Sequence, residues 1–253
     1  MKTFRWLSTL KWLLTLTMVV ALSVGAADLT GDSGKTRVLL VTGGHDYERE
    51  PFLAIFRNIP EVSFKHAEHP KAQASFEPES AKSYDVLVLY DMWQEMDGAT
   101  RTNFLNLFKS GKGVVVLHHA IANYNEWDQY AEIIGARYYL RPKKVNGIEK
   151  TRSQWLHDVE HTIHIVDPGH PVTNGMKDFL IHDETYRLFD VDLGVKPLLT
   201  TEEATSNRVI AWAKEYEKSR VVYIQLGHDH FAFDNPNYRQ LVRQAIRWTA
   251  RKD

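Results

Sequence analysis

The 253-residue sequence contains no cysteine. This absence excludes a disulfide scaffold, a thiol nucleophile and a zinc–thiolate site. The sequence also lacks any run rich in lysine and arginine. Of its 31 basic and 32 acidic residues, residues 1–27 hold three basic ones and no acidic one. The rest of the chain therefore carries a net charge of −4 with neutral histidines, and nucleic acid is not an expected partner.

One long apolar run, Trp12–Val24, follows three basic residues near the N-terminus and precedes small residues. This order is typical of a secretory signal peptide. We expect residues 1–27 to be a signal cleaved near Ala26 or Ala27, and residues 28–253 to form one secreted or periplasmic domain without stable membrane insertion. A retained anchor is the alternative, although the run is shorter than the roughly 20 residues of a membrane span.

Apolar runs alternate with amphipathic segments in the first half of the chain, which predicts βαβ units and a parallel sheet. The expected strands cover residues 37–42, 62–66, 84–90 and 113–117, and the expected helices cover residues 50–57, 100–110 and 126–135.

The pattern changes after Gly135. Residues 141–154 are polar and basic, and we expect a loop there. Short strands are expected at 162–166, 179–182, 196–200, 208–213 and 220–226, followed by a closing helix at 237–251. The predicted fold is a flavodoxin-like α/β domain with a mostly parallel sheet flanked by helices and with extra strands in its second half.

Three of the predicted strands lead into histidine, at His45, at the pair His118-His119 and at His228. Because ligands bind beyond the carboxyl ends of strands in an open α/β sheet, these side chains are expected to share one site. Imidazole can bind a proton, a metal or a hydroxyl group near neutral pH. Adjacent side chains of an extended chain diverge, so only one of His118 and His119 is expected to face the cleft.

Carboxylates and aromatic residues add candidates for the same site. Glu184 and Tyr186 should point to one side of an extended segment, with Asp183 on the other side. Asp91 and Trp93 follow the strand expected at residues 84–90. Trp93 is expected to stack on a sugar ring, and Asp91 to accept hydrogen bonds from its hydroxyl groups. Five further histidines are interpreted as structural or as rim residues, namely His157, His161, His164, His170 and His230.

Five of these motifs occur in the order found in ThuA-like proteins, which the sequence resembles from Arg37 to Arg251. They are Thr42-Gly43-Gly44-His45, Leu117-His118-His119-Ala120, His170-Pro171-Val172-Thr173-Asn174-Gly175, Asp183-Glu184-Thr185-Tyr186 and Leu226-Gly227-His228. The family is named for trehalose utilisation, and its fold is similar to that of class I glutamine amidotransferases. The resemblance implies that residues 28–253 are a ThuA-like domain of carbohydrate metabolism, linked to disaccharide breakdown through 3-keto intermediates.

The sequence departs from the amidotransferases at one decisive place. Those enzymes carry a cysteine nucleophile on a tight turn after the fourth strand, whereas this chain has His118-His119 there and no cysteine. Glutamine amidotransferase chemistry through a thioester is therefore excluded. Imidazole can instead serve as a general acid, a general base or a metal ligand.

The main functional hypothesis is a secreted enzyme that acts on a sugar or a modified disaccharide by His/Glu acid–base chemistry. The expected catalytic residues are His118, His119, Glu184 and His228, and the expected substrate-binding residues are His45, Asp91, Trp93, Asp183 and Tyr186.

Two alternatives remain open. The first is a hydrolase dependent on a divalent metal, with His45, His118, Glu184 and His228 as candidate ligands. The second is a non-catalytic carbohydrate-binding domain. No nicotinamide-binding motif follows a strand, so a redox step is expected to belong to a partner. The sugar and the oligomeric state are not specified by the sequence.

Overall fold

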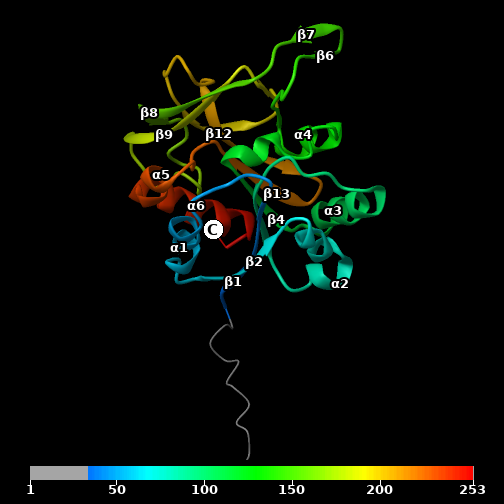
Figure 1. Cartoon of the computed structure of the whole chain (residues 1–253). Coiled ribbons are helices and arrows are strands. Elements are labelled where there is room, and N and C mark those ends of the chain that lie inside the picture. Colours follow the sequence, from blue (N-terminus) through cyan, green and yellow to red (C-terminus); the bar gives the residue numbers. More distant parts are fainter. Residues whose placement is uncertain (1–33, 253) are drawn as a thin grey trace, which may run out of the picture. The chain divides into compact units, whose positions relative to one another are not determined.

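A computed structural model of the protein describes residues 34–252, which hold a nine-stranded sheet with helices on both faces (Figure 1). The expected signal peptide lies outside the described residues. Within residues 34–252, no helix has the length and apolar character that crossing a bilayer requires. The predicted α/β class, with extra strands in the second half of the chain, is confirmed.

One half of the sheet is parallel. Its strand order is β2-β1-β3-β4-β13, which is the order of flavodoxin-like folds. The bounds are β1 Thr36–Gly43, β2 Val62–Glu68, β3 Val86–Asp91, β4 Gly113–Leu117 and β13 Ser219–Ile224. Buried Val and Leu residues fill β3 and β4, as expected of strands that are covered on both faces.

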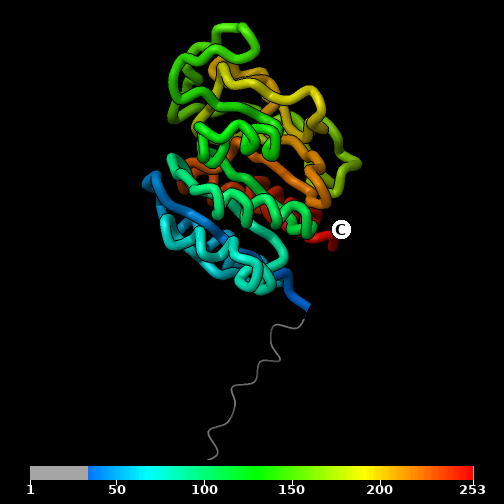
Figure 2. Tube along the Cα trace, turned by 90° about the vertical axis from the view of Figure 1, so that its right-hand side faces the viewer, coloured from blue at the N-terminus to red at the C-terminus, as the bar shows by residue number. Residues whose placement is uncertain are grey.

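The other half is antiparallel and continues the sheet as β12-β11-β8-β9. Its strands are β8 Gln154–Ile165, β9 Phe179–Arg187, β11 Lys196–Thr200 and β12 Val209–Tyr216. The early strands, in blue and cyan, and the yellow segments of the second half lie at opposite ends of the sheet (Figure 2). A small ladder joins β5 Ala136–Arg137 to β10 Asp190–Val191.

Helices cover both faces of the sheet through two separate apolar clusters. The first face carries α1 Arg49–Arg57, α5 His230–Asp234 and α6 Pro236–Thr249, and the second carries α2 Pro78–Ala81, α3 Gly98–Ser110 and α4 Asp128–Ile134. Short 3₁₀ segments, η2 Lys71–Phe76 and η3 His118–Ala122, complete the connections on the second face.

Two expectations about the second half of the chain were wrong. Residues 141–154 contain a hairpin of β6 Lys143–Val145 and β7 Ile148–Lys150. Its turn residues Asn146 and Gly147 both have positive φ, at 49° and 81°, as a two-residue hairpin turn requires. Strand β8 begins at Gln154 rather than at residue 162, because its exposed first part pairs with the far end of β9.

The turns after β1 and β3 meet closely at the carboxyl edge of the sheet. A Cβ atom on Gly44 would lie 1.8 Å from the carbonyl oxygen of Met92, and Gly44 has a φ of +83°. Only glycine fits both the conformation and the close approach. This contact brings His45 and Trp93 to the same edge, where their rings lie 5.6 Å apart.

Candidate functional site

The histidine pair lies on a turn rather than on an extended strand. Strand β4 ends at Leu117, and η3 begins at His118 with a φ of +52°. Both imidazoles are buried, and their ring centres are 5.3 Å apart. As expected, only one of the two histidines faces the cavity described below: His119 lines it and His118 is fully buried. The reason differs from the expected one, because the pair lies on η3 and not on an extended strand.

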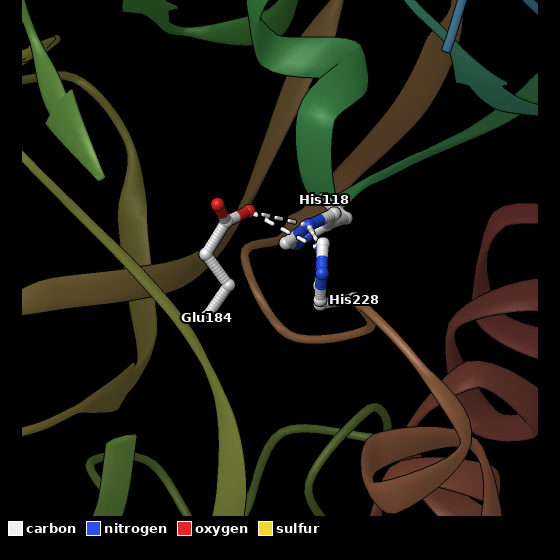
Figure 3. A group of neighbouring side chains, drawn as sticks. All are labelled: His118, Glu184 and His228. Atoms are coloured by element: carbon white, nitrogen blue, oxygen red, sulfur yellow. Dashed lines mark hydrogen bonds and ion pairs between the residues drawn. The ribbon is translucent and has the colours of Figure 1, made fainter. Parts of the chain in front are cut away.

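His118, Glu184 and His228 converge from three different segments, η3, β9 and the turn after β13 (Figure 3). His118 Nε2 is 3.0 Å from Glu184 Oε2 and 3.3 Å from His228 Nδ1. The distance from His228 Nδ1 to Glu184 Oε2 is 3.5 Å. Tyr186 OH also lies 2.8 Å from His118 Nε2, so four polar side chains meet at one point.

A backbone carbonyl fixes the orientation of the His118 ring. His118 Nδ1 lies 2.7 Å from the carbonyl oxygen of Gln225 and donates its hydrogen to that acceptor. Nε2 is therefore the nitrogen that faces Glu184 and His228. Metal-binding histidines are oriented by the same kind of outer hydrogen bond.

Charge pairing dominates the electrostatics of this cluster. Burial alone raises the pKa of Glu184, but its hydrogen bond to His118 and the charge of that residue lower the pKa to about 2. Burial lowers the pKa of His118, yet the hydrogen bond and the charge of Glu184 outweigh it and raise the pKa. Burial and the nearby His118 lower the pKa of His228. Glu184 is thus a carboxylate at neutral pH.

A cavity of about 230 Å³ opens beside the cluster. Glu184 and Tyr186 reach its wall, whereas His118 is fully buried behind them. Twelve residues line it, namely His45, Met92, Trp93, His119, Ile121, Ala122, Tyr138, Arg152, Trp155, His157, Glu184 and Tyr186. A larger cavity of about 690 Å³ lies beside α6, but no candidate site residue lines it.

His119 and His45 also line the cavity, and their rings lie 4.7 Å apart. His119 is 3% exposed, and neither of its ring nitrogens has a hydrogen-bond partner. Burial and the neighbouring histidines hold its pKa well below the usual value, so the ring is neutral. His45 Nδ1 lies 2.7 Å from the carbonyl oxygen of Asp46, which leaves its other nitrogen for the cavity.

Both expected substrate-binding carboxylates, Asp91 and Asp183, form hydrogen bonds within the protein and do not line the cavity. Asp91 is fully buried, and its Oδ2 lies 2.7 Å from His69 Nε2 and 2.6 Å from Asn123 Nδ2. Asp183 accepts hydrogen bonds from the backbone N–H groups of Gly227 and His228, at 2.7 and 2.9 Å. The structure thus places Asp183 behind the site, where it holds the turn that carries His228.

The structure adds a residue that the sequence interpretation had treated as structural. His157 lines the cavity, and its Nδ1 is 3.3 Å from Glu184 Oε1. Trp155 shares its strand face, and Tyr138 and Arg152 complete that wall. The alternation of Trp155 and His157 could have indicated that they share a strand face. These residues directly follow the segment 141–154, which was expected to be a loop, and no strand was expected before residue 162. His161, His164, His170, His182 and His230 do not line this cavity.

The geometry of the three-residue cluster fits a divalent cation. Two ligand atoms about 2.1 Å from one cation are about 3.0 Å apart at a right angle and about 3.4 Å apart at the tetrahedral angle. The observed separations of 3.0 and 3.3 Å fall within this range, and the third, 3.5 Å, lies just above it. Two imidazoles and one carboxylate suit zinc, manganese or iron.

The fold and site together define a cysteine-free α/β protein with a class I glutamine amidotransferase-like fold and a histidine–glutamate centre at the carboxyl edge of its sheet. The chain belongs to the ThuA family, described as trehalose utilisation, whose model matches residues 37–249. No curated protein matches the chain.

Solved structures support the same assignment of the fold. A putative ThuA-like protein from Parabacteroides merdae is 19% identical, with a TM-score of 0.68 over 85% of this chain and 90% of that one. One from Bacteroides uniformis is also 19% identical, with a TM-score of 0.61 over 85% and 91%. A glutamine amidotransferase from Thermotoga maritima is 14% identical, with a TM-score of 0.50 over 85% and 98%.

Proposed function

We propose that the protein is a carbohydrate-active enzyme whose reaction centre is a divalent cation held by His118, Glu184 and His228. The observation that carries the proposal is the convergence of three ligand atoms within 3.5 Å of one another, next to an open cavity. The low pKa of Glu184, about 2, supports a role as an anionic ligand rather than as a proton acceptor near neutral pH.

A sugar is the substrate that the cavity wall favours. Trp93 and Trp155 line the cavity and are 56% and 51% exposed, which presents two aromatic faces to a ligand. The description of the family, trehalose utilisation, names the same substrate class. Because 230 Å³ falls below the range of about 300–1,000 Å³ for most small-ligand sites, the enclosed part suits one sugar ring.

The side chains around the centre have separate tasks. A bound cation supplies Lewis acidity that polarises a substrate oxygen. His45 is placed to hydrogen-bond a sugar hydroxyl through its second ring nitrogen, and His119 adds a neutral ring to the same wall. Tyr186 and His157 contact Glu184 and orient its carboxylate.

A turnover screen tests this proposal. Protein purified without a histidine tag is assayed on 3-keto-disaccharides and on unmodified disaccharides, before and after chelation and with zinc or manganese restored. We expect turnover that chelation removes and added metal restores, and that His228→Ala abolishes while His164→Ala preserves. Turnover that resists chelation contradicts the metal centre, and tight sugar binding without any product favours a non-catalytic binding domain.

Metal-free acid–base catalysis is the second candidate. The hydrogen bond of 3.0 Å between His118 and Glu184, with His157 3.3 Å from the other carboxylate oxygen, could transfer protons without a cation. In that case His118 acts as a positioning residue, because Glu184 separates it from the cavity. Full turnover by chelated protein, lost in Glu184→Gln, supports this candidate over the first.

A further inference from the structure

Arg152 is a cation in the cavity wall without an anionic partner. Among residues 34–252 it has no carboxylate within 4.0 Å and no side-chain hydrogen bond, although it lines the cavity. Two nearby arginines differ, because Arg137 pairs with Asp128 at 2.5 Å and Arg141 pairs with Glu126 at 2.6 Å. The cavity therefore presents a positive charge that the protein itself does not neutralise.

The only carboxylate in the lining does not compensate for this charge. Glu184 is bonded to His118 at 3.0 Å and lies 3.3 Å from His157, so its charge is already shared with imidazoles. The other titratable groups of the lining are histidines and tyrosines. Arg152 is thus the one permanently charged cation among the residues that line the cavity.

A second, independent feature also indicates a polar ligand. His119 is 97% buried in the cavity wall and has two ring nitrogens without any partner. Burying unpaired polar atoms is unfavourable unless a ligand or water completes their hydrogen bonds. His119 therefore marks an unpaired polar position in the wall of the cavity. The exposed Trp155, at the start of β8, lines the same cavity three residues after Arg152.

We infer that the ligand of this cavity is an anionic sugar, whose carboxylate or phosphate pairs with Arg152 while its ring contacts the tryptophans. The planar guanidinium can hold either group through two parallel hydrogen bonds. The inference rests on the proposed function, since it names the substrate class of the same site. It extends that function from sugars in general to sugars that carry a negative charge.

Titration calorimetry with glucose, glucuronate and glucose 6-phosphate tests the inference on the wild-type chain, Arg152→Gln and Arg152→Lys. Arg141→Gln is the matched control. We expect glucuronate, glucose 6-phosphate or both to bind at least about tenfold more tightly than glucose. Arg152→Gln should remove that preference, Arg152→Lys should keep part of it, and Arg141→Gln should leave it unchanged. The two anionic sugars distinguish a carboxylate site from a phosphate site.

Equal affinity for the three sugars, no binding of any, or a preference that survives in Arg152→Gln overturns the inference. The turnover screen on the wild-type chain separates this result from the proposed function. An anion preference in a wild-type protein that shows no metal-dependent turnover upholds the inference while the proposed function fails. Metal-dependent turnover without an anion preference upholds the proposed function and overturns the inference.

Discussion

At the scale of single residues, the pairing of Glu184 with His118 gives the most direct prediction. In metal-free protein, the carboxylate raises the pKa of His118 above its usual value against the effect of burial. Its stabilising contribution is therefore present below pH 6.5 and is lost as the pH rises through the raised value.

Glu184→Gln removes the carboxylate charge, so that only the charge of Asp183 and the hydrogen bond to Gln225 still oppose the effect of burial on His118. We expect the pKa of His118 to fall in the chelated variant, and the free energy of unfolding at pH 6 to fall by about 3 kcal/mol. NMR titration of the imidazole signals and urea denaturation measure the two effects. The His164 signal, whose partner Asp178 is unchanged, is the internal control; an unshifted His118 would count against the pairing.

Asp183→Asn tests how the turn bearing His228 is held. Asp183 accepts three backbone N–H groups, from Gly227, His228 and Glu184, and an amide has one acceptor oxygen fewer. We expect the free energy of unfolding to fall by about 2 kcal/mol and metal affinity to fall about tenfold. The control is Asp178→Asn, because Asp178 is an exposed aspartate that accepts a hydrogen bond from the backbone N–H of Ile165. This substitution should lower the free energy of unfolding by less than about 1 kcal/mol. Equal losses in the two variants would refute the role.

At the scale of elements, the strand ends were predictable and their local conformation was not. Apolar runs identified β1, β4 and β13, and parallel topology then required their carboxyl ends to share an edge. The sequence could not show that His118 begins a 3₁₀ turn with positive φ, because no glycine or proline marks the break. It also could not place His157 beside Glu184, since that contact depends on the pairing of β8 with β9.

The close approach of the β1 and β3 turns gives a prediction for glycine. Gly44→Ala places a methyl group against the backbone of Met92 in a left-handed conformation, so we expect a loss of about 3 kcal/mol or more. The control is Gly98→Ala in α3, where no atom lies within 4 Å of the new Cβ. It should raise the free energy of unfolding by about 0.5–1 kcal/mol. Thermal denaturation compares them. A Gly44→Ala protein as stable as wild type would contradict the described turn contact.

At the scale of the whole molecule, the N-terminal segment carries a prediction about where the protein is located. We propose that residues 1–27 export the chain and are removed, on the pattern of basic, apolar and small residues. Intact mass of the chain recovered from a bacterial periplasm is expected to show an N-terminus at Ala27 or Asp28. Full-length protein in the membrane fraction would indicate a retained anchor instead.

The central claim is that three segments at one sheet edge assemble a cation site from residues 118, 184 and 228. The most direct measurement is metal content by mass spectrometry after equilibrium dialysis of tag-free protein against zinc or manganese. The account predicts one ion per chain in the wild type and in His164→Ala, and a loss of at least about tenfold in affinity in His118→Ala, Glu184→Gln and His228→Ala. Substoichiometric metal in the wild type, or equal binding by these variants, would contradict it.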